Sequence, residues 1–143
     1  MNTIVRERDM RRASSKRKGR KRKGLPTLAS LRRKLDQVFS KFIRKRDANA
    51  NGLGQCYTCN RWTVLEASHF IPRQHAATRW DERNVHGACS YCNRWQHGNL
   101  YAYGLALQKQ YGQATVDELW RSKRQAVKFH RSDLEALIVK YSA

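Results

Sequence analysis

Two short motifs in this 143-residue sequence decide its fold: Cys56-Tyr57-Thr58-Cys59 and Cys89-Ser90-Tyr91-Cys92. A two-residue spacer lets both thiolates of one motif reach a single tetrahedral ion, and two such motifs complete a zinc site. Because four thiolates close the coordination sphere, this zinc is expected to be structural rather than catalytic. We therefore predict a small zinc-stabilised domain whose ligands are Cys56, Cys59, Cys89 and Cys92.

The 29 residues between the two motifs carry the candidate chemistry. Residues 62–66 have the composition of a β-strand, and this strand leads into His69. Residues 81–86 lead back to the second motif, and a short helix is expected after Cys92, ending at Gly98. A hairpin followed by a helix, held by zinc, would bring His69, Asn84 and Asn93 together.

Positive charge is concentrated at the N-terminus. Residues 1–46 hold 18 Lys and Arg against three acids, a net charge of +15, whereas residues 47–143 hold 12 against eight, a net of +4. Residues 1–26 are interpreted as a nucleic-acid-binding arm, disordered on its own, whose centre is the run Lys16, Arg17, Lys18, Arg20, Lys21, Arg22 and Lys23. A solvated tail, or the extension of a ribosome-bound protein, is the alternative.

The rest of the chain divides into three predicted segments. Residues 27–48 form an amphipathic helix with Thr27 as N-cap, which packs on its own domain or pairs with a second copy. Residues 49–112 form the four-cysteine core, and residues 113–143 form a helical scaffold that opens with capping boxes at 115–118 and 132–135. A basic stretch in this scaffold is equally consistent with solvent and with DNA contact: Arg121, Lys123, Arg124, Lys128 and Arg131.

Aromatic residues and further histidines lie close to these motifs. Because the domain is small, we expect core packing rather than base stacking to be the role of four aromatic residues: Trp62, Trp80, Trp95 and Tyr101. His75 and His97 are expected to be exposed polar residues rather than metal ligands.

The order His69, Asn84, then Cys92-Asn93 resembles the HNH, or ββα-metal, endonucleases, and the Cys-x-x-Cys-Asn arrangement is similar to endonuclease VII-like resolvases. The sequence also resembles the phage NinG/Rap family of recombination nucleases over about residues 35–120. The matching segments are residues 42–47, Ser68-His69-Phe70, residues 78–86, and Cys92-Asn93 through 98–100 to Tyr103. The resemblance implies an α+β fold in which a zinc-held ββα-metal unit is flanked by helices.

The resemblance also implies roles for individual residues. His69 would be the general base, Asn84 the brace of the hairpin and Asn93 a ligand of a catalytic Mg²⁺ or Mn²⁺. Many HNH proteins carry an aspartate ligand directly before the base, where this sequence has Ser68. Glu66 is favoured as the missing ligand, with Asp81 and His86 as alternatives, and His86 could also be a second base or a structural residue. Arg73, Arg79 and Arg83 are candidates for binding an adjacent phosphate.

The expected function is metal-dependent endonuclease cleavage of DNA. The resemblance implies branched recombination intermediates, such as Holliday junctions or D-loops, and a resolvase would be expected as a homodimer. The rival interpretation is a non-catalytic zinc protein that binds DNA or RNA, or is associated with ribosomes. The sequence has no run of 18 apolar residues and no apolar signal segment, so no membrane contact and a cytoplasmic location, in a bacterial host if phage-encoded, are expected.

Overall fold

The computed structural model describes residues 24–143. The elements in chain order are α1 (Leu28–Asp47), β1 (Leu53–Gln55), β2 (Trp62–Val64), β3 (Glu66–His69), β4 (Val85–Ala88), η1 (Tyr91–Trp95), α2 (Leu100–Tyr111), α3 (Gln113–Ser122) and α4 (Arg131–Ser142). The chain is α+β, as predicted, and it brings its four cysteines close together. Within residues 24–143, none of the helices is long and apolar enough to span a bilayer.

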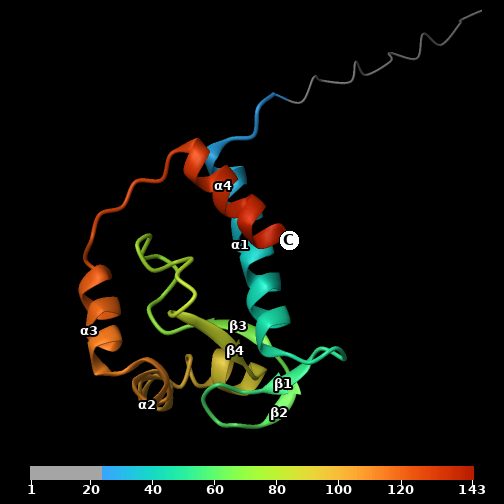
Figure 1. Cartoon of the computed structure of the whole chain (residues 1–143), viewed down its shortest axis with the longest axis vertical. Helices are drawn as coiled ribbons and strands as arrows, with labels where there is room; N and C mark the ends of the chain where they lie inside the picture. Colours follow the sequence, from blue (N-terminus) through green and yellow to red (C-terminus); the bar gives the residue numbers. More distant parts are fainter. Residues whose placement is uncertain (1–23) are drawn as a thin grey trace, which may run out of the picture.

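Helix α1 begins and ends where its sequence predicts. The Thr27 hydroxyl accepts a hydrogen bond from the Ser30 N–H at 3.1 Å, which caps the first turn. Its apolar stripe is buried in a core with Leu134 and Tyr141 of α4, and Figure 1 shows the two helices side by side. The stripe consists of Leu31, Leu35, Phe39 and Ile43. The helix therefore packs on its own domain, and this stripe is not free to pair with a second copy.

The predicted strand at residues 62–66 is wrong in one respect, because it is two strands. β2 pairs antiparallel with β1, whereas β3 pairs antiparallel with β4 in a separate sheet. Leu65 lies between them and is 2% exposed, so the chain changes sheet at a buried apolar residue. The register of the second sheet places Ser68 opposite His86 and His69 opposite Val85.

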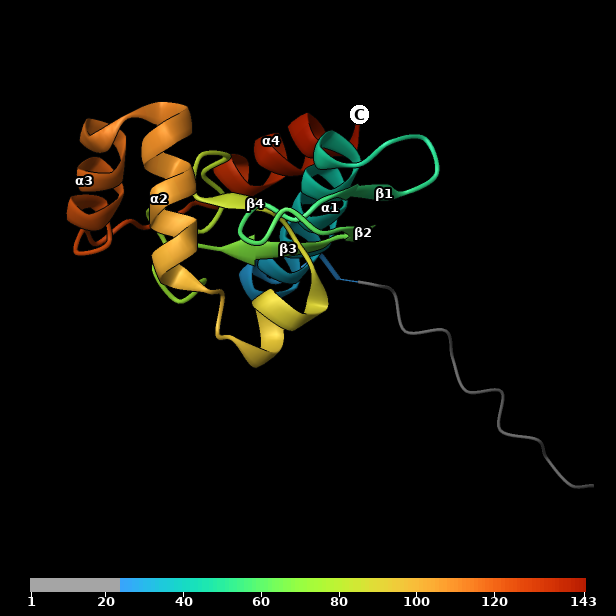
Figure 2. The same cartoon turned by 90° about the horizontal axis from the view of Figure 1, so that it is seen from below.

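Helices α2 and α3 form a second core with the end of the β3–β4 hairpin. Phe70 and Ile71, which follow β3, pack with Tyr103 and Leu107 of α2 and with Leu119 of α3. Figure 2 shows α2 beside the hairpin and the short η1 turn below β3. The segments predicted as 27–48, 49–112 and 113–143 thus share two cores, since α4 packs on α1 and α3 packs on α2.

Both predicted capping boxes are misplaced. Helix α3 begins at Gln113, directly after Gly112, so Thr115 lies inside its first turn. Its hydroxyl instead donates to the carbonyl of Tyr111 at 3.1 Å. In α4 the cap is His130, whose N–H donates to the Asp133 carboxylate at 2.7 Å. Several acidic and hydroxyl side chains near these helix starts could serve as N-caps, and tertiary packing decides at which residue each helix begins.

The expectation that the aromatic residues are core holds only for Trp80, which is 7% exposed. Trp62, Trp95 and Tyr101 are 60%, 76% and 82% exposed. Trp80 is buried because its ring packs edge-on against Phe129 and its Nε1–H donates to Asp36 of α1 at 3.0 Å.

Candidate metal and nuclease site

The four cysteines form one cluster. Their sulfur atoms all lie within 4.8 Å of one another, and those of Cys59 and Cys89 are 3.8 Å apart. Zinc–sulfur bonds of about 2.3 Å in a tetrahedron place the sulfurs about 3.8 Å apart. The cluster therefore fits a four-coordinate zinc ion and could hold one, with Cys56, Cys59, Cys89 and Cys92 as ligands.

Hydrogen bonds to the sulfurs prepare the cluster for a cation. The Cys89 N–H donates to the Cys56 sulfur at 3.2 Å, and the Cys92 N–H donates to the Cys89 sulfur at 3.4 Å. Although burial opposes it, hydrogen bonds from the Thr58 hydroxyl and from backbone N–H groups lower the pKa of Cys56 to about 6. Burial and the adjacent sulfurs raise the pKa of Cys59 to about 12. A cation bound between the sulfurs would favour their thiolate forms.

A cleft of about 390 Å³ lies along β3, between α1 and the segment that follows β4. Two of the three residues predicted as catalytic, His69 and Asn93, line it. The other polar residues of its wall are Asp36, Ser40, Ser68, Arg73 and His97. The hairpin and the cysteine motif thus bring together residues that are 61 positions apart in the sequence, Asp36 and His97.

His69 ends β3 and its ring is fixed by one hydrogen bond. Its Nε2 lies 3.0 Å from the carbonyl oxygen of Arg79. A carbonyl oxygen can only accept, so Nε2 carries the proton and Nδ1 keeps its lone pair. Burial and the positive charge of Arg73 lower the pKa of His69, although the Arg79 carbonyl opposes this. The imidazole is therefore neutral near pH 7.

Asn93 lies in η1, a turn of π-helix in which the Gln96 N–H donates to the Tyr91 carbonyl at 3.0 Å. Its side-chain NH₂ donates to Glu66 at 2.8 Å, which leaves the amide oxygen as the available acceptor. Glu66 also forms an ion pair with Arg94 at 2.6 Å, which lowers the pKa of Glu66. Glu66, favoured as a direct metal ligand, accepts this bond from Asn93 and is not among the residues that line the cleft.

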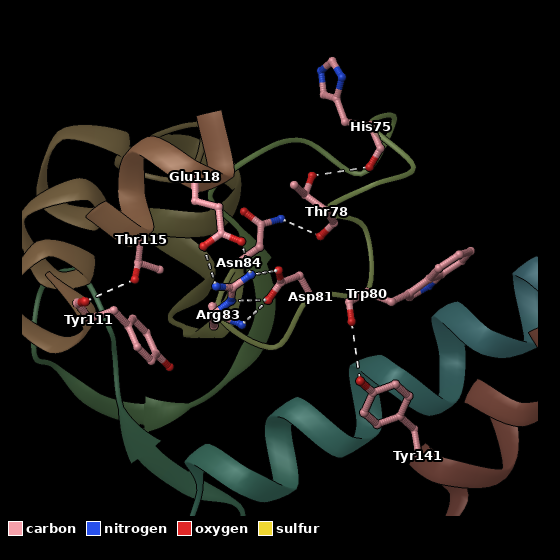
Figure 3. A network of polar contacts seen from close by, with 10 residues as sticks. All are labelled: His75, Thr78, Trp80, Asp81, Arg83, Asn84, Tyr111, Thr115, Glu118 and Tyr141. Carbon is pink, nitrogen blue, oxygen red and sulfur yellow. Dashed lines mark hydrogen bonds and ion pairs between the residues drawn. The ribbon is translucent and has the colours of Figure 1, made fainter. Parts of the chain in front are cut away.

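Asn84 forms hydrogen bonds to two residues, Ile71 and Thr78, of the loop between β3 and β4. It is fully buried, and its Oδ1 accepts from the Ile71 N–H at 2.7 Å. Its Nδ2 donates to the carbonyls of Ile71 and Thr78 at 3.0 and 2.9 Å. Figure 3 shows the bond to Thr78. These bonds tie both ends of the loop that carries Arg73 to the start of β4. Asn84 itself does not line the cleft.

The three arginines considered for phosphate binding differ in their contacts. Arg79 forms a two-pronged ion pair with Asp36 of α1. Arg83 lies between Asp81 and Glu118 (Figure 3), at 2.8 and 3.0 Å, which raises its pKa. Asp81 is thereby occupied and does not line the cleft. Among residues 24–143, Arg73 forms no ion pair, and it is the arginine that lines the cleft.

His86 lies away from the cleft, in an aromatic core. It is 3% exposed, its ring stacks on Tyr57 at 3.8 Å between centroids, and it contacts the hydroxyls of Tyr103 and Tyr111 at 3.3 and 3.2 Å. Burial and the charge of Arg46 lower its pKa to about 4. Of the roles considered for His86, this geometry favours the structural one.

His97 is the cleft residue that sequence reasoning missed. It is exposed, as expected, but it also lines the cleft with Asn93, four positions earlier. His97 lies beyond the end of η1, in a turn where its φ is +50°, so no helical spacing in the sequence indicated that it would share a cleft with Asn93. His75 contacts Gln74 and does not line the cleft. The predicted arm contacts, Lys16, Arg17, Lys18, Arg20, Lys21, Arg22 and Lys23, lie outside the described residues.

Comparison with known proteins extends over nearly the whole chain. A model of the family described as "Bacteriophage Lambda NinG protein" matches residues 2–143. The proteins named "Protein ninG" of Escherichia phage 933W and Salmonella phage P22 are each 36% identical over 86 residues, and that of Escherichia phage lambda is 35% identical. These matches cover 58% of this chain and 40–41% of the relatives, so the chain matches about two fifths of their length. No solved structure matches. The family match and the relatives agree with the resemblance to NinG proteins, and the chain belongs to the NinG family.

Proposed function

We propose that this protein is a metal-dependent DNA endonuclease of the HNH, or ββα-metal, type. One observation carries the proposal: His69, Asn93, His97 and Arg73 line a single cleft beside an antiparallel hairpin whose strand β4 leads directly into Cys89 of the cysteine cluster. Phosphodiester hydrolysis needs a base, a site for a divalent cation and a group that binds the phosphate. The cleft offers a candidate for each.

His69 is the proposed general base. Its Nε2–H is held by the Arg79 carbonyl, so Nδ1 is the nitrogen that can take a proton from water. The lowered pKa keeps this nitrogen unprotonated at neutral pH. A positioned base of this kind contributes about 10²–10⁴ in rate.

Asn93 and His97 are the proposed ligands of a catalytic Mg²⁺ or Mn²⁺ ion. The NH₂ group of Asn93 is held by Glu66, so its amide oxygen, a hard donor suited to such a cation, is available. Ser68 also lines the cleft, and its buried hydroxyl oxygen has no hydrogen-bond partner in the described part of the chain. Buried polar atoms of this kind are normally satisfied by water or an ion. When bound, the cation would neutralise charge on the scissile phosphate and stabilise the leaving oxygen.

DNA is the proposed substrate because the sequence carries a strong positive charge, +19 in all. Arg73, which has no acidic partner among residues 24–143, is the candidate for binding a phosphate next to the scissile bond. Branched recombination intermediates, such as Holliday junctions or D-loops, are proposed from the resemblance to the NinG/Rap nucleases.

A non-catalytic zinc protein that binds DNA or RNA is the second candidate. It is favoured by Ser68, which stands where many HNH proteins have a metal-binding aspartate, and by the ion pairs that occupy Arg79 and Arg83. Both functions predict binding, so only cleavage separates them.

The test is cleavage of labelled junction, flap and duplex DNA by the zinc-loaded full chain, with and without Mg²⁺ or Mn²⁺. We expect cation-dependent cleavage by the wild type, and a loss of at least about 10²-fold in His69→Ala. His75→Ala is the matched control, since His75 lies in the same loop region but outside the cleft, and it should cut like the wild type. Absence of cleavage in wild type, or equal rates in the two variants, would contradict the proposal and favour the binding protein.

A further inference from the structure

We propose that the C-terminal end of α3 is a binding surface for an unpaired DNA strand, and that it lies next to the cleft. The surface consists of Trp120, Arg121, Lys123 and Arg124, which line a hollow of about 400 Å³. The inference rests on the proposed function for its choice of DNA, but it concerns binding and not cleavage.

The indole of Trp120 is both exposed and connected to the cleft. Trp120 is 44% exposed, although the neighbouring Leu119 is only 1% exposed. Its ring packs edge-on against Phe70, with centroids 5.6 Å apart. Phe70 follows His69 directly and lines the cleft. A strand that leaves the cleft past Phe70 therefore meets the indole next.

The cations around Trp120 have no acidic partners in the described structure. Both acids of α3 are engaged elsewhere, since Asp117 accepts from Gln113 at 2.8 Å and Glu118 pairs with Arg83. Arg121 donates only to a backbone carbonyl, that of Asp117. The turn that ends α3 is fixed by backbone bonds from Lys123 to Leu119 and from Arg124 to Arg121. This fixed turn presents three uncompensated positive charges beside one aromatic face.

This combination selects an unpaired strand over a duplex. An aromatic face stacks on an exposed base, and neighbouring cations follow the phosphates, whereas the bases of a duplex are already stacked on one another. The Lys123 Nζ lies 4.9 Å from the centre of the Trp120 ring, so a cation already lies over this aromatic face. A base would displace the ammonium group, which could then bind the adjacent phosphate.

The test compares DNA binding by the wild type and Trp120→Leu, which keeps apolar volume but removes the aromatic face. Affinity for a splayed-arm DNA and for the matching blunt duplex is measured by fluorescence anisotropy, with zinc-loaded full chain and no added Mg²⁺ or Mn²⁺. We expect Trp120→Leu to weaken splayed-arm binding by about 5- to 150-fold and duplex binding by less than about twofold. Trp62→Leu is the matched control, because Trp62 is 60% exposed on β2, far from α3 in Figure 1.

A second variant keeps the test independent of any packing defect at Trp120. Replacing Arg121, Lys123 and Arg124 by glutamine should make splayed-arm binding less dependent on salt. The slope of log K against log salt concentration should become shallower by about two. The same change at Arg32, Arg33 and Lys34, three exposed cations of α1, should leave the preference for unpaired DNA intact. The inference is overturned if Trp120→Leu leaves splayed-arm binding unchanged, weakens both DNAs equally, or has the same effect as Trp62→Leu.

Failure of this inference is distinguishable from failure of the proposed function. Binding is measured without the cation that cleavage requires. If the protein binds splayed DNA through Trp120 but never cuts, the binding surface is supported and the nuclease function is contradicted. If the protein cuts normally but Trp120→Leu leaves binding unchanged, only the binding surface is contradicted.

Discussion

Replacing Asn84 by aspartate tests the loop that supports the cleft. The two side chains have nearly the same shape, but the carboxylate cannot donate. The bond from the Ile71 N–H, 2.7 Å long, survives. The carbonyls of Ile71 and Thr78, now 3.0 and 2.9 Å from the amide nitrogen, would face a carboxylate oxygen instead.

The expected loss follows from these two bonds. Each buried polar group left without a partner costs about 1–3 kcal/mol, so two such groups cost about 2–6 kcal/mol. Asn84 is 0% exposed, and water cannot reach the carbonyls without opening the loop. Small domains are stable by about 5–15 kcal/mol, so this one change would remove a large part of the stability.

The measurement is urea denaturation of the zinc-loaded protein, followed by circular dichroism at neutral pH. Asn51→Asp is the matched control, because Asn51 is exposed and the same change in charge there should alter the free energy of unfolding by less than about 0.5 kcal/mol. If Asn84→Asp destabilised the protein no more than Asn51→Asp, Asn84 would not brace the loop, and the position of Arg73 would need another explanation.

Three further predictions concern the cluster and the histidines. Removing zinc with a chelator, or replacing Cys56 by serine, should unfold the β3–β4 hairpin, since the cluster joins the end of β4 to the turn before β2, and a large fall in Tm measured by calorimetry would verify it. Neutral His86 contributes stability above its unfolded pKa of about 6.5, and this is lost as the pH falls toward the folded pKa of about 4. Between pH 7 and 4 the wild type should therefore lose about 3 kcal/mol more than His86→Phe in urea denaturation, and parallel curves would refute this. Because the pKa of His69 is lowered, the cleavage rate should stay constant as the pH falls through the range in which an ordinary histidine is protonated, and should fall only at lower pH. A rate that begins to fall above pH about 7 would contradict this.

The elements with strong local signals were predictable from the sequence. The apolar repeat from Leu31 to Ile43 and the Thr27 cap fixed α1, because helical periodicity and capping act within a few residues. The paired Cys-x-x-Cys motifs predicted the cluster, because ligand spacing is itself a geometric constraint. The expectation that Asn84 braces the hairpin came from the resemblance, and no local pattern indicated that its side chain is fully buried.

Features that depend on tertiary contacts were not predictable. Residues 62–66 read as one strand, since nothing local shows that Leu65 is buried where the chain changes sheet. The ion pair of Arg79 with Asp36 joins residues 43 positions apart, so the sequence alone could not separate Arg79 from Arg73 as a phosphate ligand. His97 appeared as one exposed histidine among several until the cleft placed it beside Asn93.

The most direct test of the proposed catalytic cation site is Mn²⁺ binding to the zinc-loaded full chain, measured by electron paramagnetic resonance. We predict one Mn²⁺ per wild-type chain, competed by Mg²⁺, and strongly weakened binding in Asn93→Ala and in His97→Ala, with zinc content unchanged. His75→Ala should bind like the wild type. Unchanged Mn²⁺ binding in Asn93→Ala and His97→Ala, or no Mn²⁺ binding by the wild type with DNA present, would contradict the account.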